Sequence, residues 1–300
     1  MSREFPLPER PERAGAQETP LGDLTVAMAT CDDDPGIFAL TVDAVAAEPL
    51  GQPAVIVDMS RGDGIRRVAE ARRDAVRYIA FPESRGLSES RNRLVEAVGT
   101  RYLAFVDADA VPAPGWARAL RRAFEEDDRL AVVGARTVPC WPGRRPKLFD
   151  TGPAFDLLAM FDLGSKRLDV PRIVGTSFAL DRERLPSDPP FSLDLGRRPG
   201  SLLSFEEVDF CLAVRARGWR IAYEPRALVH HHVRPERTRW AWMLRRAHVA
   251  GQESRLTERR LEPLPRDRSP RDYLFLATIA PAFLAGRVVA RRKVSADRRP

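Results

Sequence analysis

Tyr102-Leu103-Ala104-Phe105-Val106-Asp107-Ala108-Asp109 has the pattern of a buried strand that ends in two carboxylates. Its first five residues are apolar or aromatic, as in a strand covered on both faces. In open α/β sheets, ligands bind in the crevice outside the carboxyl ends of the strands. Mg²⁺ typically binds one or two carboxylates together with substrate phosphates. The stretch therefore predicts a cation site at Asp107 and Asp109; the alternative is a solvated turn, since Pro and Gly residues follow.

Three further strands are predicted upstream, each followed by a helix. Apolar runs at residues 24–30, 54–58 and 76–80 alternate with helical patterns at 35–45, at 65–73 and from 86 onward. This alternation is typical of a parallel, right-handed, doubly wound sheet, because parallel strands are joined by crossover helices. We therefore predict an α/β fold with a mainly parallel central sheet flanked by helices.

The predicted strands end in polar residues that we expect along one edge of the sheet. Thr30 and Asp58 end two strands, and Asp107 and Asp109 follow a third. This arrangement suits a nucleotide, with one carboxylate for the base or ribose and a pair for metal and phosphates. Asp58 is alternatively a turn residue. The chain has neither GxGxxG nor GxxxxGK, which argues against a dinucleotide fingerprint and a P-loop.

Acidic residues open a later helix, predicted over residues 205–217. Glu206, Glu207 and Asp209 lie in its first turn, where acidic side chains also offset the helix dipole. The functional alternative is a general base that accepts a proton from an incoming hydroxyl. Two stretches with few periodic runs, 139–171 and 186–204, are interpreted as binding loops.

Three of the four histidines stand together after a short apolar run. His230, His231 and His232 follow residues 227–229. They could form a solvated loop, or one neutral imidazole could complete an oxygen-rich metal site, which favours Mn²⁺-like ions more than Mg²⁺. Strand alternation points His231 to one side and its two neighbours to the other, and spacing alone does not choose among the three.

Composition narrows the compartment and the partners. The 300 residues are 44% hydrophobic with a net charge of +7. The three cysteines are far apart without a CxxC pair, which argues against a disulfide framework or a zinc site and predicts a cytoplasmic protein. No nucleic-acid-binding motif is present, so no nucleic-acid partner is predicted. Residues 1–20 are polar and Pro-rich, unlike a signal peptide, and are expected to form a disordered arm.

The C-terminal part divides into a basic and an apolar segment. Residues 234–262 interleave Arg with Trp, which suggests either a helix packed on the main domain or an interfacial helix or lid. Residues 273–290 are the most apolar, but they fall short of a 20-residue span before Arg287. We expect either a peripheral membrane helix, at the inner face of the cell membrane, or core packing. The predicted domains are residues 21–235 and a helical tail, 236–300.

In their order, these motifs resemble the family 2 glycosyltransferases with a GT-A fold, over about residues 24–232. The segment from Asp107 onward and residues 223–227 are most similar to bacterial glycosyltransferases of the mycofactocin type. The resemblance is carried by residues 24–30, Val57-Asp58, Gly86-Leu87-Ser88, Arg91-Asn92, 105–109, Pro114-Gly115-Trp116, 175–178, 206–212, Gly218-Trp219-Arg220, Pro225 and His231.

The resemblance implies roles for the nucleotide- and metal-binding residues. Asp58 would hold the nucleotide base, with Thr30 and Arg91 nearby. Asp107 would lie by the ribose and the metal. Asp109 and His231 would be the other metal ligands.

For the chemistry, the resemblance implies a metal-dependent, inverting transfer of a sugar from a nucleotide-sugar donor to an acceptor hydroxyl. Mn²⁺ or Mg²⁺ is the expected cation, and Glu207 rather than Glu206 corresponds to the family's base. The acceptor is left open among a lipid carrier, a polysaccharide, a peptide and a small natural product. Two alternatives remain: a nucleotidyltransferase, which usually carries a Gly-rich loop where this chain has Cys31-Asp32-Asp33-Asp34, and a sugar-nucleotide-binding scaffold without catalysis.

Overall fold

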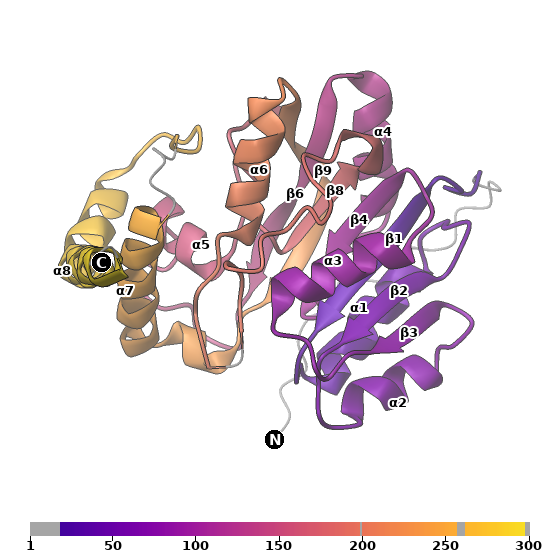
Figure 1. Ribbon diagram of the computed structural model, residues 1–300, viewed down its shortest axis with the longest axis horizontal. Helices are drawn as coiled ribbons and strands as arrows, with labels where there is room; N and C mark the ends of the chain where they lie inside the picture. Colours follow the sequence, from indigo (N-terminus) through magenta and orange to yellow (C-terminus); the bar gives the residue numbers. More distant parts are fainter. Residues whose placement is uncertain (1–18, 199, 257–261, 298–300) are drawn as a thin grey trace.

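The computed structural model describes residues 19–198, 200–256 and 262–297, with side chains as far as residue 290 (Figure 1). The predicted N-terminal arm lies almost entirely outside these residues. The strands are β1 Leu24–Thr30, β2 Ala54–Asp58, β3 Val76–Ala80, β4 Tyr102–Val106, β5 Ala110–Pro112, β6 Leu130–Cys140, β7 Leu168–Asp169, β8 Ser177–Asp181 and β9 Arg220–His232. The helices are α1 Pro35–Ala46, α2 Gly64–Glu70, α3 Leu87–Ala97, α4 Trp116–Glu126, α5 Gly152–Leu158, α6 Glu206–Ala216, α7 Trp240–Leu256 and α8 Pro270–Asp297, with short 3-10 turns η1 Arg182–Arg184 and η2 Pro235–Thr238.

The nine strands found in the described residues form one sheet. Its main path runs β3-β2-β1-β4-β8-β6-β9-β5, with β7 paired to β9. The first four strands of this path are parallel, as predicted. Beyond β4 the sheet is mixed: β8 is antiparallel to β4 and β6, whereas β9 is parallel to β6 and antiparallel to β5 and β7. The predicted α/β class and flanking helices are confirmed. The sequence does not show which strands are antiparallel, because a buried strand has the same apolar pattern in either direction.

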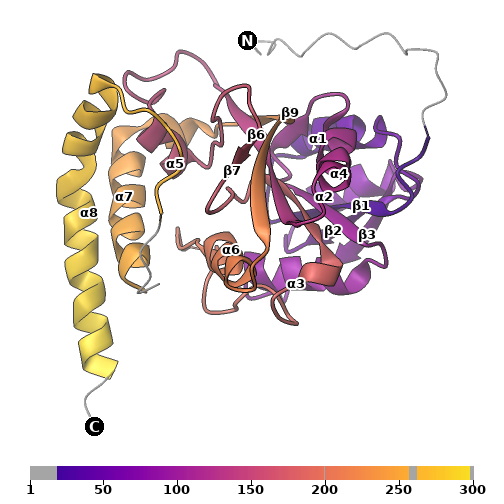
Figure 2. The same ribbon diagram turned by 90° about the horizontal axis from the view of Figure 1, so that it is seen from above.

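Helices cover both faces of the sheet, and β4 shows why. All five of its residues are buried, and alternate side chains point to opposite layers. Tyr102, Ala104 and Val106 pack with residues of α1, α2 and α4, whereas Leu103 and Phe105 pack with residues of α3 and α6. Figure 2 shows the same division, with the two sets of helices on opposite sides of the sheet.

Strand register brings the predicted polar residues to one region. Thr30 is opposite Asp58 at the ends of β1 and β2, and β4 runs parallel beside β1. β9 is longer than predicted: one strand of 13 residues replaces two short extended segments, with an irregularity after Glu224 where Pro225 is tolerated. Its last residues pair with β5, so that Ala110 lies opposite His231. This pairing carries the histidine run to the end of β4.

Two sequence predictions in the second half need correction. The strand predicted over residues 173–180 begins only at Ser177. The preceding residues leave the sheet and form a wall of the cavity described below. The irregular stretch 139–171 contains α5 and the short strand β7. The loop predicted at 186–204 has no regular helix or strand among its described residues.

The C-terminal helices α7 and α8 lie side by side, apart from the sheet (Figures 1 and 2). Their backbones approach closely at two glycines: a Cβ atom on Gly251 would lie 2.0 Å from the Phe283 carbonyl oxygen, and one on Gly286 would lie 1.9 Å from that of His248. A third hydrophobic core joins α5, α7 and α8. The predicted C-terminal helical extension is thus confirmed.

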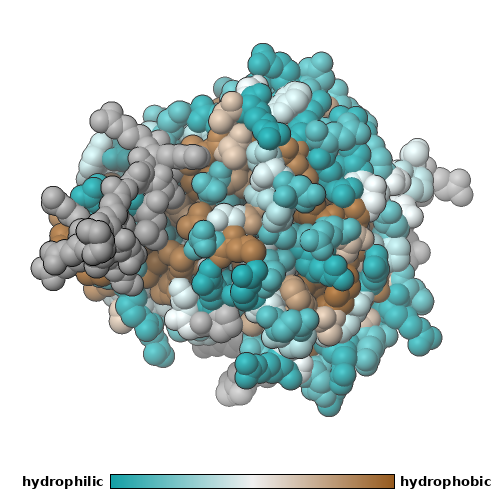
Figure 3. All heavy atoms as spheres, viewed as in Figure 1, coloured by the Kyte–Doolittle hydropathy of each residue, from teal (hydrophilic) through white to brown (hydrophobic). Residues whose placement is uncertain are grey.

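The apolar segment predicted over residues 273–290 lies within the longer helix α8. Residues Pro270–Ala290 are long and apolar enough to cross a membrane, and only 22% of the most apolar window is buried. Large hydrophobic side chains exposed on α8 are Tyr273, Leu274, Leu284, Val288 and Val289. By contrast, charged and polar residues dominate the face of the protein drawn in Figure 3.

Candidate active site

A cavity of about 430 Å³ opens at the carboxyl ends of β1 and β4. Its wall includes Asp107 and Asp109 after β4, the two acids at the start of α6, and His231 near the end of β9. The tail also contributes, through Arg234, Arg237 and residues of α7. The cavity therefore draws on both sides of the predicted domain boundary at residue 235.

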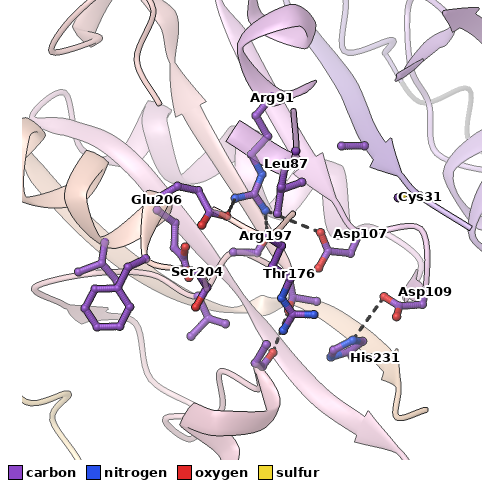
Figure 4. A pocket seen from close by; sticks show the side chains of 18 of the residues that line it. Cys31, Leu87, Arg91, Asp107, Asp109, Thr176, Arg197, Ser204, Glu206 and His231 are labelled. Carbon is purple, nitrogen blue, oxygen red and sulfur yellow. Dashed lines mark hydrogen bonds and ion pairs between the residues drawn. The ribbon is translucent and has the colours of Figure 1, made fainter. Parts of the chain in front are cut away.

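Asp109 and His231 are direct neighbours in this cavity (Figure 4). The His231 Nε2 atom lies 3.4 Å from Asp109 Oδ1, and both side chains are largely buried. The backbone fixes this geometry, since the His232 N–H donates to the Asp109 carbonyl at 2.8 Å. The Nδ1 atom of His231 is buried and has no hydrogen-bond partner among the described residues. Of the three histidines in the run, His231 is the one that lines the cavity.

The two aspartates experience different electrostatic surroundings. Burial raises the pKa of Asp107 to about 6, although the nearby Arg91 guanidinium opposes the shift. Burial also disfavours the charged form of Asp109, but the His231 ring, its hydrogen bond and the guanidinium groups of Arg237 and Arg234 outweigh it and lower the pKa. Asp109 is thus held as a carboxylate at the cavity wall.

These residues fit a cation that is shared with a phosphate ligand. Asp109 and His231 offer an oxygen and a nitrogen ligand, and the Asp107 side chain remains 33% exposed beside them. Within residues 19–198, 200–256 and 262–297, no three His, Cys, Asp or Glu side chains form a ready-made metal cage. Mg²⁺ and similar ions commonly complete their coordination with substrate phosphates and water, so an incomplete protein ligand set is consistent with a nucleotide-bound cation.

Of the two acids at the start of α6, Glu206 and Glu207, Arg91 binds only the first. The Arg91 Nη1 atom donates to Glu206 Oε1 at 2.7 Å, and both residues are 2% exposed. Arg91 also donates from Nη2 to the Gly175 carbonyl at 2.8 Å and lies 3.8 Å from Asp107. Burial and the adjacent Glu207 carboxylate raise the pKa of Glu206 to about 8, while Arg91 acts in the opposite direction. The hydrogen bond from Arg91 therefore holds Glu206 inside the protein.

Glu207 has a different environment, although it is the next residue. Its side chain lines the cavity, and its Oε2 atom is buried with no hydrogen-bond partner in the described part of the chain. Gly175 allows this packing: a Cβ atom there would lie 3.0 Å from Arg91 Nη2 and 3.4 Å from the Glu207 carboxyl carbon. Glu206 shares these two features, but Arg91 binds its other oxygen. Glu207 is the one of the two that no described guanidinium holds in place.

The predicted nucleotide-binding residues have partners within the protein. Asp58 is 1% exposed and accepts hydrogen bonds from the Ser60 N–H and the Tyr78 hydroxyl, each at 2.8 Å. The Thr30 hydroxyl donates to Asp33 at 2.8 Å. Neither Thr30 nor Asp58 belongs to the residues that form the cavity wall, and Arg91 reaches it from α3. The nucleotide-binding roles of these three residues stay predictions.

Two arginines of the C-terminal part, Arg234 and Arg237, also line the cavity. Arg234 forms ion pairs with Asp33 and, at 3.7 Å, with Asp109. Arg237 is nearly buried, and burial together with Arg197 lowers its pKa to about 10. From the sequence, both fall in the basic segment 234–262. The useful signal was their position two and five residues after His232, which places them beside the metal candidates once β9 is extended.

Comparison with known proteins gives a consistent result. The family described as Glycosyl transferase family 2 matches residues 26–184. The glucosyl-dolichyl phosphate glucuronosyltransferase of Haloferax volcanii is 26% identical over 230 residues, which cover 74% of this chain and 72% of that protein. The pre-mycofactocin glycosyltransferase of Mycobacterium tuberculosis is 28% identical over 184 residues, 61% of this chain but only 37% of the relative.

Among solved structures, a mannosyltransferase from Pyrobaculum calidifontis in complex with GDP-Man and Mn²⁺ is similar in fold. Its TM-score is 0.58 at 20% identity, covering 92% of this chain and 76% of that one. A GalNAc-T7 structure with UDP, GalNAc and Mn²⁺ has a TM-score of 0.54 at 14% identity, covering 86% and 48%. At these identities the likeness concerns the fold alone, which is the predicted GT-A fold.

Proposed function

The chain belongs to glycosyl transferase family 2, and from this premise we propose that it catalyses a metal-dependent, inverting sugar transfer. The donor is a nucleotide sugar, as expected for a glycosyltransferase whose structural neighbours hold GDP-Man or UDP. The acceptor is a hydroxyl group. The proposed base is Glu207, and the proposed cation ligands are Asp107, Asp109 and His231.

The observation that carries this proposal is the unequal pairing of the two acids. Both acids line the cavity and each has one buried oxygen without a hydrogen-bond partner in the described part of the chain. Arg91 binds the other oxygen of Glu206, whereas no guanidinium among the described residues pairs with Glu207. A general base must reach the proton that it removes, and a carboxylate that no guanidinium holds can turn toward the acceptor hydroxyl, whereas Glu206 is fixed by Arg91. Asp109 and His231 line the same cavity as Glu207, so a base and a phosphate-binding region face one space.

The proposed chemistry is a single displacement. Glu207 removes the proton of the acceptor hydroxyl while that oxygen attacks the anomeric carbon of the donor sugar. The bond from this carbon to the diphosphate breaks on the opposite face, and the bond pair leaves with the diphosphate, so the anomeric configuration inverts. A bound divalent cation would offset the charge that develops on the diphosphate. Arg234 and Arg237 lie where they can add to that stabilisation.

A lipid-linked acceptor at the membrane is the acceptor class we propose. The Haloferax volcanii relative is named for a dolichyl phosphate substrate. Exposed hydrophobic side chains gather on α8, which also passes the length and composition test for a membrane span. The three cysteines are free, as in a reducing compartment. We therefore place the enzyme at the cytoplasmic face of a membrane, with α8 in contact with lipid.

Two neighbouring substitutions test the assignment of the base. Glu207→Gln should abolish turnover of the donor, with a loss of about 10²–10⁴-fold, while the melting temperature stays close to that of the wild type. Glu206→Gln should do the reverse: it weakens the buried pair with Arg91 and lowers stability, and folded protein keeps measurable turnover. Full turnover in purified Glu207→Gln would remove Glu207 from this role.

A further inference from the structure

A buried polar network joins α7 to the loop that precedes α6. Glu253 of α7 accepts hydrogen bonds at Oε1 from the Ser204 backbone N–H, at 2.7 Å, and from the Ser204 hydroxyl, at 3.0 Å. Arg246 of α7 donates to Glu253 Oε2 and to the Ser204 hydroxyl, each at 2.9 Å. Glu253 is 0% exposed and Arg246 is 6% exposed. Two buried side chains of α7 therefore hold Ser204 of the catalytic domain through direct hydrogen bonds.

Ser204 comes immediately before a strained turn. Phe205, which caps α6, has φ 82° and ψ 0° in the left-handed region. A bulky side chain is disfavoured there, at a cost of about 1–3 kcal/mol, and such a conformation persists only where the surroundings impose it. The bonds from Glu253 and Arg246 to Ser204 fix the chain on one side of Phe205.

The other side of the turn is fixed by a separate contact. Glu206 follows Phe205 and is bound to Arg91 from α3. The segment 204–206 is thus held at both ends by buried guanidinium and carboxylate groups. Glu207 is the next residue, and its carboxylate faces the cavity (Figure 4 shows Ser204 and Glu206 on the same wall). Any rotation of this turn would move the Glu207 carboxylate.

We propose that Ser204, Arg246 and Glu253 are positioning residues that aim Glu207 at the acceptor hydroxyl, an inference that rests on the proposed function. A purely stabilising role is the weaker explanation, because a buried ion pair often stabilises a fold no more than an apolar pair of the same volume. An apolar pair could not supply the directional hydrogen bonds to Ser204. The C-terminal tail is, on this account, part of the active site.

Two variants and one control distinguish the positioning of Glu207 from a purely stabilising role of the network. Ser204→Ala removes the hydroxyl but keeps the backbone bond to Glu253. Arg246→Met with Glu253→Leu replaces the buried pair by apolar groups of similar volume, so the helix retains its packing. Ser254→Ala is the control, because it removes a hydroxyl of the same helix that donates to the Gly251 carbonyl within α7.

The assay measures nucleoside-diphosphate release from whichever of GDP-mannose, UDP-glucose and UDP-glucuronic acid the wild type hydrolyses fastest. We expect kcat to fall about 10-fold in Ser204→Ala and about 100-fold in the double variant, with the donor KM nearly unchanged, because small displacements of a reacting group have effects of this size. Amide hydrogen exchange at residues 204–209 should become faster in both variants. Ser254→Ala should change neither quantity.

The outcomes distinguish this inference from the function on which it rests. Normal kcat in both network variants, beside an inactive Glu207→Gln, overturns the positioning role alone. A raised KM with unchanged kcat in the double variant also overturns it, since Arg246 would then bind the donor directly. A wild type that shows neither turnover nor metal-dependent nucleotide binding with any donor, or full turnover by Glu207→Gln, contradicts the proposed function itself.

Discussion

Replacing Arg91 by methionine should leave the Glu206 carboxyl group buried without its cation. The pair is joined at 2.7 Å, both residues are almost fully buried, and the guanidinium carbon lies 5.5 Å from the Phe178 ring centre. Removing one partner of a buried ion pair typically costs about 3–5 kcal/mol. In a chain of this size each kcal/mol corresponds to roughly 2 °C. We therefore expect the melting temperature of Arg91→Met to fall by about 6–10 °C at pH 9, where Glu206 of the wild type is mostly ionised.

The loss should depend on pH in a defined direction. The pKa of Glu206 is raised to about 8, mainly by burial and by Glu207, from an ordinary value of 4.5. An acid with a raised pKa in the folded state binds more protons folded than unfolded, so stability falls as pH rises between the two values. Without Arg91 the charged form is penalised further. Below about pH 7 Glu206 is protonated with or without Arg91, so the destabilisation by Arg91→Met should be nearly constant there and should grow as pH rises through 8 toward 10.

Thermal unfolding at several pH values between 6 and 10, followed by circular dichroism, measures this. Arg93→Met is a matched control on the same helix, because Arg93 pairs with Glu96 on the surface and such pairs contribute little. The double variant Arg91→Met with Glu206→Leu should recover much of the lost stability, since an apolar pair can replace a buried ion pair. A pH-independent loss, or a double variant no more stable than Arg91→Met, would refute the reasoning.

Two further predictions concern other parts of the site and tail. Gly175→Ala should lower kcat by about 10-fold or more and cost about 1–3 kcal/mol of stability, because the added methyl would press on Arg91 and Glu207; unchanged kinetics in the purified variant would show that this wall is not tight. Leu284→Asp with Val288→Asp should reduce sedimentation with phosphatidylglycerol vesicles, whereas alanine at both positions should have a smaller effect; equal sedimentation of the aspartate variant and the wild type would contradict membrane contact through α8.

The first half of the fold was predictable because its elements are local and strongly patterned. The strands ending at Thr30 and Asp58 and the strand before Asp107 have the predicted bounds, and Trp116 begins the predicted helix. Each of these strands is an apolar run closed by a polar or turn-forming residue. Asp107 and Asp109 reach the cavity because parallel strands expose their carboxyl ends along one edge.

The rest of the site depends on pairings between distant segments, which periodicity does not record. Nothing in the residues around Arg91 shows that it binds Glu206, and a nucleotide-binding role was the prediction there. Likewise, the sequence allowed the segment 234–262 to pack on the main domain, but its pattern does not show that Arg246 and Glu253 are buried against Ser204. Such contacts arise only when the tail packs on the domain, and tertiary packing of this kind decides which charged residues are buried.

The most direct test of metal-dependent sugar transfer is nucleoside-diphosphate release from a panel of nucleotide sugars. The wild type and Asp109→Ala would each be measured with Mn²⁺, with Mg²⁺ and with chelator. The account predicts release from one preferred donor that requires a divalent cation and is lost in Asp109→Ala, because Asp109 is held as a carboxylate beside His231. Equal release in the presence of chelator, or neither release nor metal-dependent nucleotide binding with any donor, would contradict it.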